Sequence, residues 1–281
     1  MLVILAQINI TTMKKIVYLL FAASFISVSC SNNDDSDNNE GANATVYLPD
    51  TEGTYWVYDT EAETSGTTGR DSLYTANDTV IGAETYKKFK TGAMATGFYS
   101  GALSGNSVRQ SGGKLILNGA ASLNFSEDLP LAISVTNFTF FDAGATPTTQ
   151  LGITSGTISQ TIQNYPVNVD YELKAVAGTD VTNFTANGIT YTNVKTVKMT
   201  LTASVKVMLT VSGLQVPVPA MEEQPVLVST QYYAENIGVV KVETDIDYHL
   251  SDFSSLGITL PIDSSGSEHQ EELLVNYHIG Q

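Results

Sequence analysis

The hydrophobic positions of the chain repeat with a period of two over most of its length. From Val197 to Val211 every odd-numbered residue is apolar, while the even-numbered residues are Lys, Thr, Ser or Met. Because successive side chains of a β-strand point to opposite faces, this pattern predicts a strand with one buried and one solvated face. At about 3.3 Å per residue the strand would be roughly 50 Å long, so we expect it to twist strongly or to bend at a bulge.

The same alternation recurs in the rest of the C-terminal half, and turn residues separate the repeats. It predicts further strands at 167–175, 240–250 and 273–279. Turns are predicted at the following four places: Ala-Asn-Gly at 186–188, Val-Ser-Gly at 211–213, Glu-Asn-Ile-Gly at 235–238 and the proline-rich segment 217–225.

The N-terminal half contains shorter runs of the same kind, separated by Gly, Asn, Asp and Ser. They predict strands at 55–58, 71–74, 79–81, 86–89, 97–100 and 114–117. No window of ten or more residues shows a helical period with capping residues, so few helices are expected. The pattern therefore predicts an all-β fold. Its sheet should be mostly antiparallel and up-and-down, curved into a barrel, a half-barrel or a two-sheet sandwich.

The first thirty residues follow a different pattern. Residues 16–28 are almost all apolar, and Met13-Lys14-Lys15 precede them as a short positive head. This order is typical of a secretory signal peptide, because a transmembrane helix needs a longer run of about 20 apolar residues. Residues 1–12 carry no charge, and we interpret them as lying upstream of the true start at Met13.

The single cysteine, Cys30, follows this apolar run. The residues Ser27-Val28-Ser29-Cys30 resemble the lipobox of bacterial lipoproteins, in which a cysteine is acylated on sulfur and becomes the new N-terminus. A lone exported cysteine has no partner for an internal disulfide, and a thioether-linked lipid would account for it. The resemblance implies a signal peptide at 13–29, a membrane anchor at Cys30 and the lipoprotein export machinery as a partner. The alternative is an ordinary signal peptide with a chance cysteine.

Residues 30–45 are rich in Asn, Asp and Ser and contain no basic residue. Such a composition cannot bury enough apolar surface to fold, so we expect a flexible acidic tether with a mean reach of roughly 20 Å. An acidic tract directly after the lipidated cysteine resembles the signal that sends lipoproteins of the Bacteroidota to the outside of the outer membrane. The resemblance implies a cell-surface location, and the alternative is a plain linker facing the periplasm.

Residues 46–281 remain as a single all-β domain. Parts of this domain, at 53–60 with 78–90 and at 232–244, resemble Bacteroidota lipoproteins, some of them described as lipocalin-like. Removal of Lys14 and Lys15 with the signal peptide leaves 11 basic and 29 acidic residues, a formal charge of −18. A chain this acidic is repelled by phosphate backbones and anionic headgroups, which argues against nucleic-acid binding and against peripheral docking on membranes.

Candidate chemistry is sparse. The residues Glu243, Asp245, Asp247 and His249 alternate along one predicted strand and therefore share a face, with neighbours about 7 Å apart. They are a weak candidate for a metal site. The more ordinary interpretation is a row of charged side chains on the solvent-exposed face of a strand. His269 is expected in a solvated Ser/Glu-rich loop. No nucleophile, phosphate-binding or dinucleotide motif occurs, so no catalytic residue, cofactor or metal is predicted.

Two tripeptides, Asp71-Ser72-Leu73 and Asp78-Thr79-Val80, resemble the acceptor motif of general protein O-glycosylation in the Bacteroidota. They imply Ser72 and Thr79 as candidate glycosylation sites.

Three functional hypotheses remain open. The leading one is a lipid-anchored, non-enzymatic envelope lipoprotein whose β body binds a ligand, such as a small apolar molecule inside the sheet. The second is a glycan- or protein-interaction module that binds through exposed aromatic side chains. The third is a hydrolase that uses two converging carboxylates. The ligand itself is not identified by the sequence.

Overall fold

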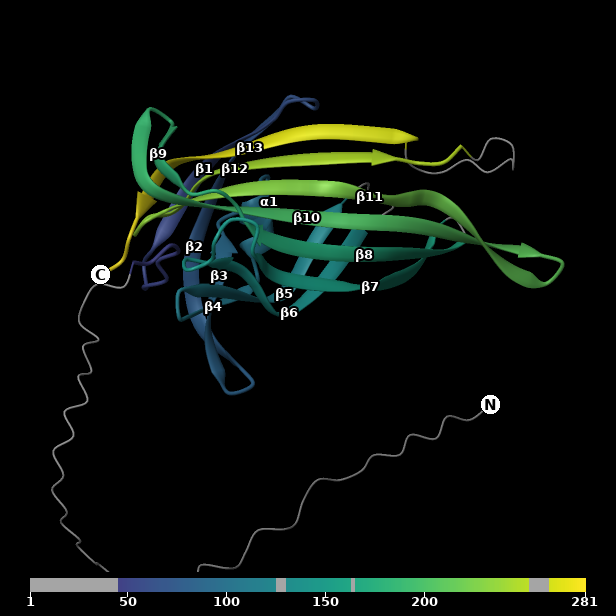
Figure 1. The fold of residues 1–281 in the computed structure, drawn as a ribbon, viewed down its shortest axis with the longest axis horizontal. Helices are drawn as coiled ribbons and strands as arrows, with labels where there is room; N and C mark the ends of the chain where they lie inside the picture. Colours follow the sequence, from purple (N-terminus) through teal and green to yellow (C-terminus); the bar gives the residue numbers. More distant parts are fainter. Residues whose placement is uncertain (1–44, 125–129, 163–164, 253–262) are drawn as a thin grey trace, which may run out of the picture. The chain divides into compact units, whose positions relative to one another are not determined.

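The computed structural model describes residues 45–124, 130–162, 165–252 and 263–281. The body of the chain, Ala44–Gln281, forms one compact unit. Its elements in chain order are β1 (Tyr55–Ala62), β2 (Thr67–Ile81), β3 (Glu84–Thr91), α1 (Phe98–Leu103), β4 (Ser107–Ser111), β5 (Lys114–Asn124), β6 (Pro130–Asp142), β7 (Gln150–Ile162), β8 (Tyr165–Ala177), β9 (Val181–Ala186), β10 (Ile189–Val211), β11 (Leu214–Ala234), β12 (Gly238–His249) and β13 (Ser265–His278) (Figure 1).

The strands form one antiparallel sheet in which most chain neighbours are also sheet neighbours. The order is β6-β5-β4-β3-β2-β1-β13-β12-β11-β10-β8-β7, and β9 pairs with one end of β10. The first and last strands, β1 and β13, therefore pair in the middle of the sheet. The two sheet edges are the consecutive strands β6 and β7.

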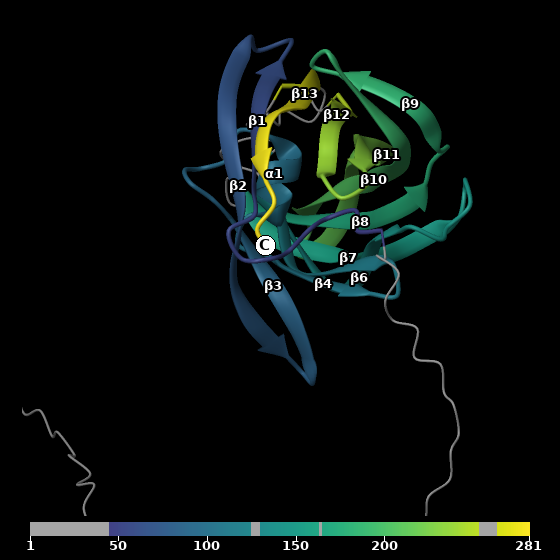
Figure 2. The same cartoon turned by 90° about the vertical axis from the view of Figure 1, so that its left-hand side faces the viewer.

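The sheet curls until these two edges meet, and it is nearly closed into a barrel (Figure 2). A Cβ atom on Gly152 of β7 would lie only 2.5 Å from the carbonyl oxygen of Thr139 on β6, so the edges touch there. The predicted all-β, antiparallel, up-and-down fold is confirmed, and of the three predicted shapes the barrel is the one that the sheet approaches.

Aromatic side chains fill one end of the barrel. Those that are less than 2% exposed include Trp56, Tyr58, Phe89, Phe141 and Tyr233. The indole nitrogen of Trp56 donates to the carbonyl oxygen of Ile237 at 2.5 Å, and the Tyr58 hydroxyl donates to that of Val239 at 2.9 Å. Both of these buried polar tips thus find a partner, which offsets the cost of burying a donor.

Several strand predictions are confirmed and extended by the structure. The strand expected at 197–211 is part of β10, and the predicted turns at 186–188, 211–213 and 235–238 separate observed strands. In the turn after β10, Ser212 and Gly213 have φ values of 54° and 82°, which suit a two-residue hairpin turn. The predictions at 71–74 and 79–81 belong to one strand, β2, with an irregularity between Thr75 and Asp78.

The predicted strand at 97–100 and the predicted turn at 217–225 are wrong. The segment 97–100 is not a strand but the start of helix α1, because buried carboxylates from β2 and β13 bind its backbone N–H groups. The proline-rich segment 217–225 is not a turn but part of β11. Its prolines are tolerated because β12 pairs with β11 only from Leu227 onward. Beyond that point the end of β12 and the chain after it bond to the Gln224 side chain and to the Ala220 carbonyl oxygen, so no N–H of a proline is needed there.

Within the described residues no helix is long and apolar enough to cross a membrane.

Candidate functional site

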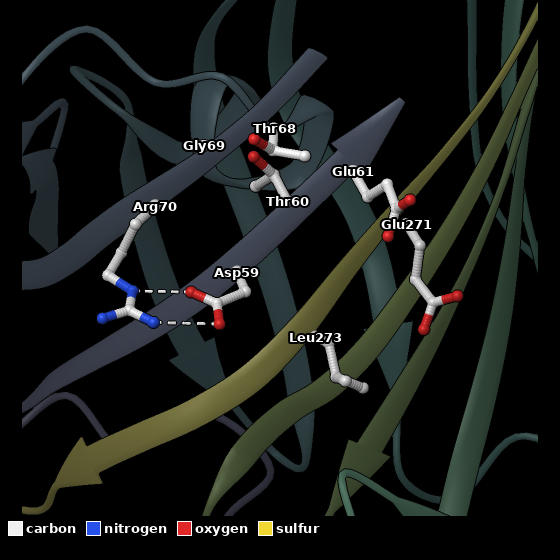
Figure 3. Close-up of a pocket in the computed structure, with 8 residues that line it drawn as sticks. All are labelled: Asp59, Thr60, Glu61, Thr68, Gly69, Arg70, Glu271 and Leu273. Atoms are coloured by element: carbon white, nitrogen blue, oxygen red, sulfur yellow. Dashed lines mark hydrogen bonds and ion pairs between the residues drawn. The ribbon is translucent and has the colours of Figure 1, made fainter. Parts of the chain in front are cut away.

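A groove of about 550 Å³ lies on the part of the sheet formed by β1, β2 and β13 (Figure 3). We call it the outer-face groove. Its lining residues are Asp59, Thr60, Glu61, Thr68, Gly69, Arg70, Glu271 and Leu273. The strand register explains why most of them converge: Arg70, Asp59 and Leu273 lie directly opposite one another, and so do Thr68, Glu61 and Glu271.

An ion pair crosses the middle of the groove. The guanidinium of Arg70 binds the carboxylate of Asp59 with two hydrogen bonds, from Nε at 2.6 Å and from Nη2 at 3.0 Å. The hydrogen bond from Arg70 holds the pKa of Asp59 below its ordinary value. Such a two-pronged pair fixes both side chains and leaves one guanidinium nitrogen and the outer carboxylate lone pairs open to a ligand.

Two further carboxylates lie side by side at one end of the groove. Glu61 and Glu271 are cross-strand partners, and Figure 3 shows their side chains on neighbouring strands. Lys241 offsets part of this repulsion, because its ammonium group lies 3.3 Å from Glu271 and 2.9 Å from Glu243. Glu61 itself is exposed to solvent.

An aromatic row crosses the same three strands a short way along them. Tyr74 of β2 lies opposite Tyr55 of β1, which in turn lies opposite His278 of β13. The rings of Tyr55 and His278 are stacked with their centroids 5.8 Å apart. Tyr74 is 36% exposed, so the row offers accessible ring faces next to the polar groove.

The predicted weak metal candidate lies on β12, the strand next to β13 in the sheet. Glu243, Asp245, Asp247 and His249 do share one face of β12, as expected. Most of them are bound to other side chains: Glu243 accepts a hydrogen bond from Tyr232 and pairs with Lys241, and Asp245 lies 2.6 Å from Nδ1 of His269. Among the described residues, no three His, Cys, Asp or Glu side chains are arranged to hold a metal ion.

His269 does not lie in a loop, which corrects the expectation from the sequence. It is part of β13, which begins at Ser265 rather than near residue 273. The hydrogen bond to Asp245 raises the pKa of the His269 imidazole above 6.5. The two side chains are cross-strand partners on β12 and β13, so this pair joins strands rather than forming a site.

Beneath the groove, on the inner face, two buried carboxylates hold the segment that leads into α1. Asp71 accepts hydrogen bonds from the backbone N–H groups of Thr96 and Gly97, the latter at 2.7 Å. Glu272 accepts hydrogen bonds from the N–H groups of Tyr99 and Ser100 and from the Ser100 hydroxyl, at 2.5, 3.1 and 2.8 Å. Figure 2 shows α1 on the inside of the curved sheet.

Glu272 is 1% exposed, and burial raises its pKa to about 7 despite the three hydrogen bonds that favour its charged form. The nearby charge of Asp71 acts in the same direction as burial. Sequence reasoning missed both carboxylates because the N–H groups that they bind belong to a segment distant from them in the sequence. A faint signal exists in β2, where Asp71 shares its strand phase with the apolar Leu73.

The remaining predicted sites fall into two groups. Cys30 and the lipobox residues Ser27, Val28 and Ser29 lie outside the described residues. Ser72 is exposed on β2, but its motif partner Asp71 is buried and bound to the α1 segment. In the second motif Asp78 and Val80 are exposed and Thr79 is half-buried, so this motif is the more accessible of the two.

No protein-family model matches the chain, and no curated protein matches it. Among solved structures, it is similar to a crystal structure described as a candidate lipoprotein from Parabacteroides distasonis ATCC 8503. The identity is 10%, the TM-score is 0.35, and the match covers 84% of this chain and 100% of that chain. A similarity this low carries no argument about fold or function.

Proposed function

We propose that this chain is a non-enzymatic lipoprotein of the cell envelope, anchored through Cys30 to the outer membrane and exposed at the cell surface. Its β body binds a neutral, hydroxyl-rich ligand such as a glycan in the outer-face groove. The anchor and the location rest on the residues around Cys30 and on the acidic tether. The binding role rests on one observation, the convergence of polar groups and aromatic rings on one face of β1, β2 and β13.

The groove supports a hydroxyl-rich ligand because its polar groups are of the kind that bind paired hydroxyls. Carboxylates accept two hydrogen bonds and a guanidinium donates several in one plane. The Arg70–Asp59 pair presents both within 3.0 Å of each other. Since the two charges offset each other and Glu61 adds a negative charge, an anionic ligand would be repelled, which favours a neutral one.

The aromatic row supports the same ligand class. Sugar rings have apolar C–H faces beside their hydroxyls. Tyrosine rings pack against such faces while their own hydroxyls remain hydrated. Tyr55 lies four residues before Asp59 on β1, which places the row about 13 Å from the ion pair along the strand. That spacing fits an extended ligand of two or more sugar units.

The other hypotheses have narrower support. The aromatic end of the barrel is filled, so an apolar ligand inside the sheet would have to enter at the opposite end. There, Ile158, Leu209 and Ile246 are only half-buried on the inner face. A hydrolase would need a carboxyl group of raised pKa within the groove, and in the described part of the chain the carboxyl group with that property, Glu272, faces the interior.

Binding is tested with the chain from residue 30 onward, carrying Cys30→Ser so that it stays unlipidated. We expect it to bind one group of neutral glycans on a glycan array, and we expect Arg70→Ala and Tyr74→Ala each to weaken that binding at least about tenfold. The matched control is Lys206→Ala, which removes an exposed ion pair with Asp170 on another part of the sheet. Binding of no glycan, or equal loss in the control, would refute the assignment.

Anchoring is tested in cells with the same Cys30→Ser change in the full chain. The parent chain should appear in the outer-membrane fraction with a lipid mass on residue 30, and external protease should remove its body from intact cells. The variant should lose the lipid mass and leave the membrane fraction. A variant that is still processed and still fractionates with membranes would contradict the anchor.

A further inference from the structure

We infer that the hairpin joining β10 and β11 is a second membrane contact, one that inserts apolar side chains into a lipid surface. The evidence begins with charge. The fifteen residues from Val207 to Met221 contain no Asp, Glu, Lys, Arg or His, although the whole chain carries a formal charge of −16. Charged residues, Lys206 and Glu222, stand on both sides of this run.

The tip of this hairpin extends beyond its neighbours in the sheet. The ladder between β8 and β10 ends at Val207, and on the other side the Ser251 N–H donates to the Ala220 carbonyl oxygen at 2.8 Å. Among the described residues, the segment between Val207 and Ala220 is therefore a two-stranded projection, which Figure 1 shows extending past the other labelled strands at one end of the body. Leu209 and Val218 at the base of the projection still pack against the core, but the tip beyond them does not. The uncharged composition of the tip therefore needs another explanation.

Apolar side chains on the projection are open to solvent. Leu214 is 71% exposed and Val216 is 40% exposed, and both continue the phase of the strand positions that face the core further along the hairpin. A lone exposed apolar residue is ordinary, but a projecting tip that is both apolar and uncharged has the composition that an interfacial membrane contact needs.

A lipid surface fits this tip better than a partner protein that adds a strand. The outer edge of β11 contains Pro217, Pro219 and Pro225, which have no N–H to donate, so strand addition along that edge is blocked. Any contact of the tip must then be made by its side chains. None of the side chains between Val207 and Met221 can form an ion pair with a partner protein.

The tether from the proposed anchor joins the body at Val46, so the bilayer lies within the length of the tether from this end of the body. Val46 is bonded to Asn236 in the turn after β11, with the Asn236 N–H donating to the Val46 carbonyl oxygen at 2.6 Å. The hairpin tip is at the other end of β11, whose 21 residues span roughly 65 Å. A body lying along the bilayer would thus touch it at both ends, through the acyl chains and through the hairpin.

The acidic character of the body restricts which lipid the hairpin can meet. Repulsion by anionic headgroups acts on the charged faces, so the uncharged tip should prefer a zwitterionic surface. The sequence argued against peripheral docking because the chain is acidic. That charge opposes docking on anionic lipid, but it does not oppose contact between the uncharged tip and zwitterionic lipid.

The test uses the unlipidated chain from residue 30 with Cys30→Ser and vesicles of phosphatidylcholine, read out by flotation. We expect measurable binding, and a loss of about tenfold in the partition coefficient for Leu214→Glu. The matched control is Val80→Glu, which places the same charge on a side chain that is 69% exposed at the tip of the β2–β3 hairpin. The control should bind as the parent does.

Insertion is read separately from Leu214→Trp. The natural Trp56 is fully buried, so a blue shift of the added emission on mixing with phosphatidylcholine vesicles reports the tip entering lipid. The inference is overturned if the parent does not float with these vesicles, if it binds only when phosphatidylglycerol is added, or if Val80→Glu loses as much binding as Leu214→Glu. An unshifted Trp emission would overturn it as well.

Discussion

Replacement of the buried carboxyl group by an amide, Glu272→Gln, should change how the stability of the body depends on pH. In the folded chain the pKa of Glu272 is about 7, against 4.5 for an ordinary glutamate. The folded state therefore keeps this proton over a range in which the unfolded chain has lost it. Folding becomes less favourable as pH rises through that range, and the loss is complete above pH 7.

The size of the effect follows from the shift. A difference of 2.5 pKa units between 4.5 and 7 corresponds to about 3 kcal/mol when the full range is crossed. Between about pH 5 and about pH 8 the parent should lose about 2–3 kcal/mol of this stabilisation. Since the amide introduced by Glu272→Gln does not titrate, the variant should gain this amount of stability relative to the parent over that interval, whatever its stability at the lower pH.

The assay is urea unfolding, followed through the fluorescence of the buried Trp56, at several pH values. His269 also has a raised pKa, so its stabilising contribution is lost as pH rises above 6.5, in the same direction as that of Glu272. Comparing variant with parent removes this term. The control Glu271→Gln deletes a carboxyl group from the adjacent, outward-facing residue. Parallel curves for the parent and Glu272→Gln would refute the argument.

Three further outcomes are expected. Leu201→Ala leaves a cavity at a fully buried position of β10 and should lower the free energy of unfolding by about 2–5 kcal/mol, measured in urea, whereas Leu214→Ala at the exposed tip should change it by less than about 0.5 kcal/mol. Gly238→Ala should lower the melting temperature, because Gly238 has a φ of 116° and a Cβ atom there would lie 2.7 Å from Nε1 of Trp56; an unchanged melting temperature would contradict that contact. If the acceptor motifs are used after folding, peptide mass spectrometry should find glycan on Thr79 and not on Ser72, whose neighbour Asp71 is buried.

The period-two pattern was enough to predict the long strands, because one solvated and one buried face leave a clear trace in the sequence. It failed where the inner face is polar. Along β13 the inward positions include Glu268, Gln270 and Glu272, so the strand looked like a loop until residue 273. Helix α1 was missed for a different reason: six residues are too few to show a helical period, and the carboxylates that hold the helix come from distant strands.

Prolines misled the sequence interpretation in a different way. Pro217, Pro219 and Pro225 are turn formers by local preference, and nothing local indicates that they lie where β11 is no longer paired with β12. The outer-face groove could not be predicted either, because Asp59 and Arg70 become neighbours only through the register of β1 and β2. The acidic row on β12, in contrast, was placed correctly on one face from its spacing alone.

The pairing of β1 with β13 has a consequence for how the body is made. The central ladder of the sheet joins the strand that leaves the ribosome first to the one that leaves it last, so β1 has one unpaired edge until synthesis reaches residue 278. Barrel closure must therefore wait for the final strand. If the chain is exported, as we propose, that delay would keep the polypeptide open while it is threaded through a membrane.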